Sequence, residues 1–431
     1  SSTHQFGVLD LIRAGLQDLD TARTLLDELR ADGIDDDRLC LLMKTLEQTC
    51  EPDIALRNLV DIIKALQSQG RDFHQVITDD AGLVRLVTVL GVSDEMGKLM
   101  RFRPELVMAA ASDSCESHLY NHAQRRAHVL EAVGADPADN RMPKATKPLA
   151  EAATALRQTY RKQLAAIMAQ DATADDPIEI QPRISQELSD LADAALEGAL
   201  AIARDEVDGS EHVRFAIIGM GKLGARELNY VSDVDLIYVV EPADKDTNGM
   251  TLNRVGTKMA TTLQRVCQSV IMGVAEPTLW QIDGGLRPEG KDGPLVRKLE
   301  SHEAYYEQWA ENWEFQALLK ARPVAGDPDL GQAYMDMTRP FVWTASKRDN
   351  FVYDCQQMRK RVEDLIPAPL KDREIKLGRG GLRDVEFTVQ MLQLVHGRAD
   401  ETLRTSSTLE SLQRLAEGGY VSRRQAKKLS W

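Results

Sequence analysis

Two aspartates at the start of an apolar segment carry the clearest chemical signal in the sequence. Asp233 and Asp235 belong to the stretch 233–240, whose apolar and β-branched residues predict a strand. Because side chains alternate across a strand, both carboxylates point to the same face. Two carboxylates held this close repel each other unless a cation lies between them. Mg²⁺ is the expected cation, with Mn²⁺ as a substitute, because it prefers carboxylate oxygens and leaves room for substrate phosphates.

A third aspartate completes the predicted metal site. Asp283 ends the segment 278–283, which predicts another strand. A D-x-D pair alone is more often a solvated strand start. The prediction of a metal site therefore depends on the third carboxylate and on the neighbouring segments. Metal ions that bridge three carboxylates stabilise the entering and leaving oxygens of a displacement at phosphorus. The predicted catalytic residues and metal ligands are Asp233, Asp235 and Asp283.

A glycine-rich turn precedes the paired aspartates. The predicted strand 213–218 ends in the segment 219–224 (Gly-Met-Gly-Lys-Leu-Gly), from which a short helix is expected to run through Tyr230. Glycines let the backbone approach a phosphate closely, and backbone amides at a helix start bind phosphate. The predicted phosphate- or nucleotide-binding residues of this region are Gly219, Gly221, Lys222 and Ser232.

The order of these segments argues against a dinucleotide-binding fold. In that fold a full helix follows the glycine turn, and an acidic residue follows about 20 residues later. The distance from the turn to Asp233 is too short for such a unit. A strand, a G-x-G turn, a short helix, a D-x-D strand and a third aspartate together resemble the core of polymerase-beta-like nucleotidyltransferases.

The flanking residues narrow this resemblance to one family. Residues 219–237 resemble the hallmark of bacterial glutamine synthetase adenylyltransferase, also called the adenylyl-removing enzyme. Two further blocks, 283–327 and 375–393, match the family in the same order. One departure is Gly285, because the family usually carries arginine two residues after the third aspartate. Arg287 is retained.

The resemblance implies an α+β fold, with a polymerase-beta-like nucleotidyltransferase core and a small mixed sheet, embedded in a largely α-helical chain. Apolar residues recur at helical spacing before the core, and a turn-rich stretch follows them. The predicted regions are a helical N-terminal region (1–135), a linker with helices leading into the core (136–211), the core (212–300) and a C-terminal helical region (301–431).

Members of the family resemble two fused copies of one nucleotidyltransferase domain. One copy removes AMP from a tyrosine of glutamine synthetase with inorganic phosphate and releases ADP, and the other attaches AMP from ATP. The N-terminal, AMP-removing copy is expected here, because Arg383 follows the Gly-Gly-x motif of 380–382 where the attaching copy tends to carry threonine. The implied partners are adenylylated glutamine synthetase, inorganic phosphate or ADP, and a PII signalling protein.

Further basic residues lie in the family blocks. Phosphate or nucleotide binding is predicted for them, although a helix C-terminus that favours cations explains Lys320 and Arg322 equally well. Two other functions stay open: the AMP-attaching domain of the same family, and a catalytically silent domain that binds nucleotide or a PII protein. The presence of all three aspartates argues against a catalytically silent domain. The basic candidates are Arg287, Lys320, Arg322 and Arg383.

The composition limits the partners further. The formal net charge of the 431 residues is −14, which argues against nucleic acid because binding its backbone requires a basic face. No apolar run approaches the roughly 20 residues that span a membrane, and the first residues lack the pattern of a signal peptide. A cytoplasmic protein without a membrane partner is expected. The last residues, 429–431, do not resemble a domain end, so we expect a longer parent protein.

The five cysteines are scattered along the sequence, and none has the spacing of a zinc ligand. Reduced, buried thiols are therefore expected.

Overall fold

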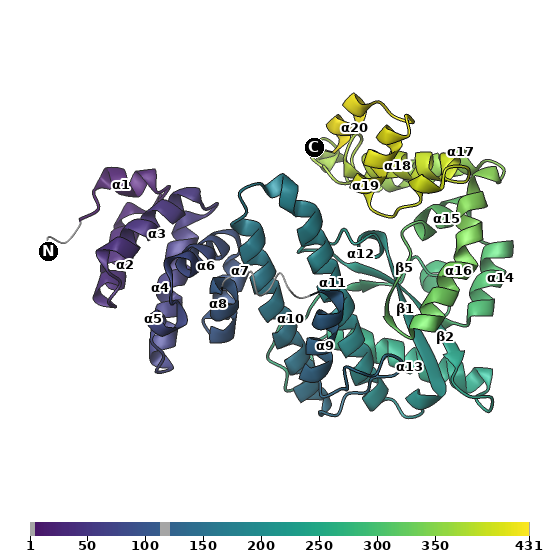
Figure 1. Cartoon of the computed structure of the whole chain (residues 1–431), viewed down its shortest axis with the longest axis horizontal. Helices are drawn as coiled ribbons and strands as arrows, with labels where there is room; N and C mark the ends of the chain where they lie inside the picture. Colours follow the sequence, from purple (N-terminus) through teal and green to yellow (C-terminus); the bar gives the residue numbers. More distant parts are fainter. Residues whose placement is uncertain (1–4, 113–120, 431) are drawn as a thin grey trace. The chain divides into compact units, whose positions relative to one another are not determined.

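The computed structural model describes residues 5–112 and 121–430 (Figure 1). The chain forms two compact units, each built from separated segments. The first unit comprises residues 1–125 and 158–191, and the second comprises residues 126–157 and 192–431. The sequence-based boundaries at 135, 211 and 300 stay a prediction.

The first unit is helical, and its apolar residues form one core. Leu56, Leu59, Ile63 and Leu66, which recur at helical spacing in the sequence, are buried there. Short helices begin at aspartates or prolines, which satisfy or avoid the unpaired amides of a helix start. The helices before the first gap are α1 (Val8–Arg13), α2 (Leu19–Ala31), α3 (Asp36–Gln48), α4 (Pro52–Ser68), α5 (Phe73–Val76), α6 (Asp80–Val92), α7 (Asp94–Met100) and α8 (Pro104–Ala111).

A mixed sheet forms the centre of the second unit, as predicted. The strand order is β3-β2-β1-β5, and β4 also pairs with β2. The β1–β2 and β1–β5 pairs are antiparallel, whereas β3 and β4 run parallel to β2. The strands are β1 (Val213–Met220), β2 (Val234–Pro242), β3 (Ile282–Asp283), β4 (Val296–Arg297) and β5 (Arg322–Gly326).

Helices cover both faces of this sheet (Figure 1). On one face, Ile218, Ile237 and Val239 share a buried cluster with residues of α14, α15 and α16. On the other face, α13 packs against β1 and β2. Since residues i and i+2 of a strand share a face, Asp235 points to the same side as Ile237. The helices of this unit from the sheet onward are α12 (Gly221–Gly224), α13 (Gly249–Gln268), α14 (Leu299–Gln308), α15 (Asn312–Leu318), α16 (Pro328–Thr344), α17 (Phe351–Asp364), α18 (Leu382–His396), α19 (Thr408–Glu417) and α20 (Arg423–Leu429).

The helices α9 (His122–Ala132), α10 (Leu149–Ala172) and α11 (Pro177–Glu206) precede the sheet. Within the second unit, the buried Arg157 of α10 donates to the carbonyls of Val266, Ser269 and Glu276. One guanidinium therefore satisfies backbone acceptors at and beyond the C-terminal end of α13, which would otherwise lack intrahelical partners.

Three predicted elements differ from the structure. Only the last two residues of the predicted strand 278–283 pair, and α12 ends at Gly224 instead of continuing through Tyr230. The region after residue 301 is not wholly helical, because β5 adds an edge strand. In the sequence Pro323 indicated only an interruption of the helical region, but an edge strand tolerates a residue without an amide donor.

The thiols only partly match the expectation. Cys267 and Cys355 are buried, Cys40 is partly buried and Cys50 is exposed, all in the free form. Cys115 lies outside the described residues. In the described part of the chain, no helix is long and apolar enough to cross a membrane.

Gly224 tests the packing that holds the glycine turn against β5. A Cβ at this position would lie 1.9 Å from the Lys320 carbonyl oxygen and 2.5 Å from that of Gly219. Gly224→Ala is therefore expected to lower the free energy of unfolding by about 3 kcal/mol, measured by urea denaturation. Gly249→Ala is the matched control, because a Cβ there meets nothing within 4 Å. Equal stability of the two variants would contradict this packing.

Candidate active site

The pairing of β1 with β2 brings the glycine turn against the second aspartate. Met220 lies opposite Asp235 in the register, and Gly221 follows with a positive φ of 54°. A Cβ on Gly221 would lie 2.5 Å from the Oδ2 atom of Asp235. Glycine is therefore required here both for the turn and for the space that the carboxylate occupies.

The parallel pairing of β3 brings the third aspartate to the same place. Asp283 is the register partner of Asp235. Its Oδ1 atom accepts a hydrogen bond of 2.8 Å from the amide of Gly285. Asp233 lies just before β2 and is exposed, and the hydroxyl of Ser232 donates to its carbonyl. The structure thus brings all three predicted aspartates to one end of the sheet.

The electrostatics at Asp235 favour a bound cation. Burial, and then the negative charges of Asp283 and Asp233, raise the pKa of Asp235 to about 6, against the opposing effect of Arg383 and Lys376. Carboxylate oxygens are the ligands that Mg²⁺ prefers, so the donor set fits this ion. Among the described residues, the three carboxylates do not bring one oxygen each within 4.8 Å of one another. Closing a coordination shell around one ion therefore requires these side chains to move, and the exposed side chain of Asp233 has room to do so.

A cleft of about 440 Å³ opens beside the aspartates. Its wall includes Arg287, whose guanidinium donates to the carbonyls of Gly284, Lys291 and Gly293. These bonds fix the loop after β3 and leave Arg287 as part of the wall. The residues around the cleft are Asp233, Gln264, Gln281, Ile282, Asp283, Gly284, Arg287, Lys291 and Leu295.

Lys222 follows the glycine that lies against Asp235, and the charge of Arg383 acts on Asp235. Burial, and then the positive charge of Lys376, lowers the pKa of Lys222. Within the described residues, no carboxylate oxygen lies within 4.0 Å of the Lys222 ammonium. Arg383 lies in the first turn of α18, 3.5 Å from Glu386. The charges of Arg383 and Lys222 both remain available to a ligand beside Asp235.

Lys320 occupies a different environment from the one predicted. Its buried ammonium lies 2.7 Å from Glu386 and 3.1 Å from Glu227, and it donates to the hydroxyl of Thr408. Burial alone would lower the pKa of Lys320, but Glu386 and Glu227 outweigh it and raise the pKa. This group, which we call the Lys320 cluster, joins the loop after α12 to α18 and α19.

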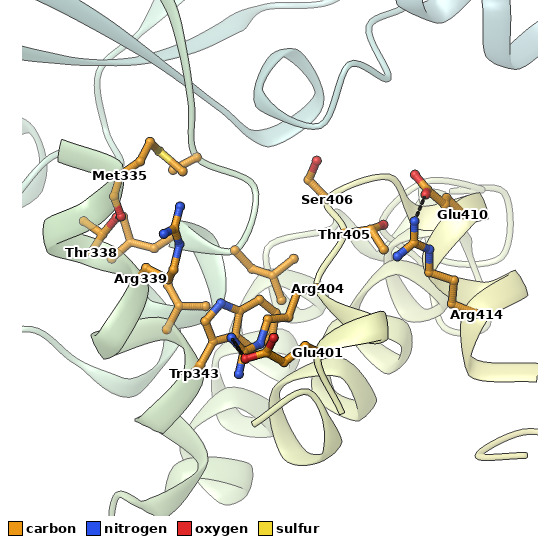
Figure 2. Close-up of a pocket in the computed structure, with 14 residues that line it drawn as sticks. Met335, Thr338, Arg339, Trp343, Glu401, Arg404, Thr405, Ser406, Glu410 and Arg414 are labelled. Carbon is orange, nitrogen blue, oxygen red and sulfur yellow. Dashed lines mark hydrogen bonds and ion pairs between the residues drawn. The ribbon is translucent and has the colours of Figure 1, made fainter. Parts of the chain in front are cut away.

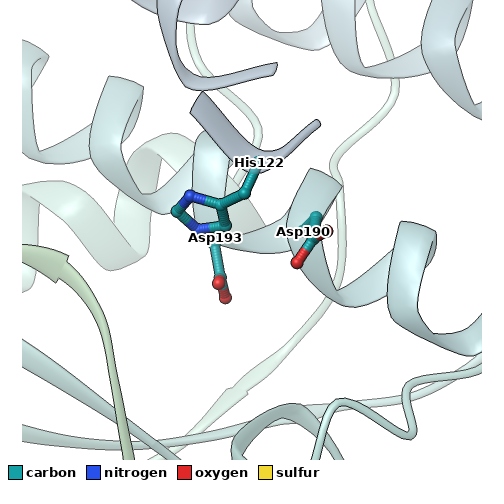
Figure 3. Close-up of side chains that lie close together, drawn as sticks. All are labelled: His122, Asp190 and Asp193. Atoms are coloured by element: carbon teal, nitrogen blue, oxygen red, sulfur yellow. The ribbon is translucent and has the colours of Figure 1, made fainter. Parts of the chain in front are cut away.

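Arg322 is also bound within the fold. Its guanidinium makes two hydrogen bonds of 2.6 and 3.1 Å to Asp193, whose carboxylate is fully buried. It donates as well to the carbonyls of Leu223 and Gly224. Figure 3 shows Asp193 one turn after Asp190 on α11. The arrangement favours a structural role for Arg322, fastening β5 and α12 to α11.

A larger cavity, of about 800 Å³, is lined by none of the three aspartates (Figure 2). Arg404 lies over the ring of Trp343 and 3.0 Å from Glu401, and Arg414 pairs with Glu410. These arginines already have partners. Volume alone therefore does not identify the site.

Three charged residues near the site received no role, or only a weak one, from the sequence. Lys376 lies in the family block 375–393, but its position before a glycine turn gave no chemical signal. Glu227 and Glu386 resembled ordinary acidic residues near helix starts. Their contacts with Lys320 join segments that are far apart in the sequence, which residue spacing does not reveal.

The fold and the site together define a nucleotidyltransferase-type core: an antiparallel strand pair, a glycine turn, and aspartates from two adjacent strands. The family model described as glutamate-ammonia ligase adenylyltransferase matches residues 83–337, and the chain belongs to this family. A second model, described as GlnD PII-uridylyltransferase, matches residues 356–431.

Curated relatives agree with this assignment. The chain is 76% identical over 430 residues to the bifunctional glutamine synthetase adenylyltransferase/adenylyl-removing enzyme of Bifidobacterium longum (strain DJO10A); the match covers 100% of this chain and 40% of the relative. Identity to the enzyme of the same name from Cutibacterium acnes is 44% over 422 residues, covering 98% of this chain and 42% of the relative. The chain thus spans about two-fifths of the length of these relatives.

The repulsion between the aspartates predicts opposite effects of one substitution with and without metal. In metal-free buffer, Asp235→Asn should raise the free energy of unfolding by about 1 kcal/mol, because it removes a half-buried negative charge beside Asp283. In excess Mn²⁺ the wild type should become more stable than the variant, because it gains binding free energy that the variant lacks. Thermal unfolding with EDTA and with Mn²⁺ measures both effects.

Asp246→Asn is the control, because this exposed aspartate follows the other end of β2. It should respond to Mn²⁺ as the wild type does. If Asp235→Asn retains the full stabilisation by Mn²⁺, the metal site does not include this carboxylate.

Proposed function

We propose that this chain removes AMP from an adenylylated tyrosine of glutamine synthetase by phosphorolysis and releases ADP. The observation that carries the proposal is the position of Arg383, whose charge acts on Asp235 from α18. A cation facing the aspartates suits a reaction in which a second anion, inorganic phosphate, must approach phosphorus. The names of the relatives include both an attaching and a removing activity.

The reaction balances without a further reactant. An oxygen of hydrogen phosphate forms a bond to the phosphorus of AMP, the bond from phosphorus to the tyrosine oxygen breaks, and the proton of hydrogen phosphate ends on the phenol. The products are ADP and the unmodified tyrosine side chain of glutamine synthetase. A divalent cation held by Asp233, Asp235 and Asp283 would supply positive charge to the oxygens around phosphorus.

The chain's own groups position the reactants. The backbone of Gly219 and Gly221 binds the phosphate of AMP beside Asp235, and the Lys222 ammonium supplies positive charge between this phosphate and the attacking one. The charge that spreads over the non-bridging oxygens in the transition state is stabilised by fixed groups, so catalysis is mainly positioning and electrostatics. Arg287 shapes the wall of the cleft through its bonds to loop carbonyls.

The AMP-attaching activity is the second candidate, because the description of the matching family model names an adenylyltransferase. The same aspartates would then act on ATP and release pyrophosphate. A PII protein is a proposed regulatory partner, supported by the match of residues 356–431 to a model described as a PII-uridylyltransferase.

Asp233→Asn separates the catalytic proposal from a purely structural one. Incubation of the chain with adenylylated glutamine synthetase, Mg²⁺ and phosphate should release ADP, and the variant should lose at least about 10²- to 10³-fold of this rate, since one charged ligand of the reacting centre is removed. Its unfolding midpoint should stay close to that of the wild type, because Asp233 is exposed.

Asp246→Asn is again the control and should keep the wild-type rate. If the chain releases pyrophosphate from ATP but no ADP from the adenylylated substrate, its activity is attachment of AMP and not removal. Full activity of Asp233→Asn would exclude this aspartate from the reacting centre.

A further inference from the structure

Three cations gather on the side of Asp235 that faces the C-terminal helices. Lys222 lies in α12, Lys376 lies in the loop before α18, and Arg383 lies in the first turn of α18. The charges of Lys376 and Arg383 act on both Asp235 and Lys222. Groups from three separate segments therefore meet next to the aspartates.

Backbone geometry fixes the loop that carries Lys376. The amide of Arg383 donates to the carbonyl of Lys376, and the amide of Leu382 donates to that of Ile375, both at 2.9 Å. A Cβ on Gly381 would lie 2.3 Å from the Ile375 carbonyl oxygen, so this close return of the chain requires glycine. Lys376 and Arg383 are thus held side by side along the backbone.

A chain of contacts connects this loop to the glycine turn. The amide of Glu227 donates to the Lys222 carbonyl at 2.8 Å, and the carboxylate of Glu227 lies 3.1 Å from Lys320. The Lys320 ammonium also lies 2.7 Å from the carboxylate of Glu386, and Glu386 lies 3.5 Å from Arg383. The Lys320 cluster thus holds the cations of α12 and of α18 around one space.

The positive charge in this space is incompletely balanced by the protein. Glu227 and Glu386 both bind the buried Lys320, and Glu386 is shared with Arg383. Among the described residues, neither Lys222 nor the exposed Lys376 has a carboxylate oxygen within 4.0 Å. Cations held together without direct ion pairs of their own repel one another, and an anion bound between them reduces this cost.

We propose that Lys376, together with Lys222 and Arg383, forms the subsite for the inorganic phosphate that attacks the AMP–tyrosine bond. This inference rests on the proposed function. The subsite concentrates a dianion beside the reacting phosphorus, whereas water carries no charge and gains no such binding. The three cations therefore favour phosphorolysis over hydrolysis: the phosphate oxygen bonds to phosphorus, the tyrosine oxygen leaves, and the proton of hydrogen phosphate ends on the phenol.

The first test compares Lys376→Gln with Lys371→Gln in the full chain. Both substitutions remove one exposed lysine from the same loop, but Lys376, unlike Lys371, is among the main charges that shift the pKa values of Asp235 and Lys222. With adenylylated glutamine synthetase and Mg²⁺, Lys376→Gln should raise the KM for phosphate about ten- to hundredfold, with a smaller change in kcat. Lys371→Gln should keep the wild-type KM, and Lys376→Arg should restore most of the phosphate affinity.

The second test does not need the reaction. Inorganic phosphate should raise the unfolding midpoint of the chain and of Lys371→Gln, and this stabilisation should be lost in Lys376→Gln. If the chain releases ADP but Lys376→Gln keeps the wild-type KM for phosphate, the subsite is wrong and the proposed function stands. If the chain releases no ADP, the proposed function fails, and a stabilisation by phosphate that depends on Lys376 still supports an anion subsite. Equal stabilisation of all variants by phosphate would overturn the subsite.

Discussion

The register between β1 and β2 is the constraint on which the candidate site depends. Met220 pairs with Asp235, so the chain leaves β1 directly beside a carboxylate, and Gly221 is the residue that makes this turn. A shift of one residue would turn Asp233 and Asp235 to the other face of the sheet. The parallel pairing of β3 uses the same position of β2, so Asp283 joins the set only in this register.

The Lys320 cluster extends that constraint beyond the sheet. A buried lysine with two carboxylates contributes little net stability, because desolvation offsets most of the attraction, but loss of one partner leaves a buried charge unpaired. Such a cluster therefore fixes the relative position of the segments that it joins, and it adds little to the stability of the fold. Lys320 lies two residues before β5, while its partners Glu227 and Glu386 belong to the loop after α12 and to α18, so any movement of α18 relative to the sheet must break the cluster.

The strongly periodic and glycine-marked parts of the fold were predictable, and the elements that depend on distant contacts were not. The strands at 213 and 234, the glycine turn and the convergence of the aspartates followed from alternation and spacing. β5 was missed because Pro323 and its short length hide an edge strand. Arg322 was assigned to phosphate, although it binds Asp193, 129 residues away in the sequence. Long-range pairing of this kind leaves no trace in local spacing.

The two charged sets around Asp235 explain why the fold retains unfavourable electrostatics. Burial and then the other aspartates raise the pKa of Asp235, and burial and then the other cations lower that of Lys222, so each set opposes its own ionisation. Each set also favours the ionisation of the other. The charges of Arg383 and Lys376 act to lower the pKa of Asp235, but they come from separate segments that leave space between the cations and the carboxylate. Direct ion pairs would close this space and remove the site. Charges held near each other without complete pairing are the arrangement expected where ligands of both signs complete the balance.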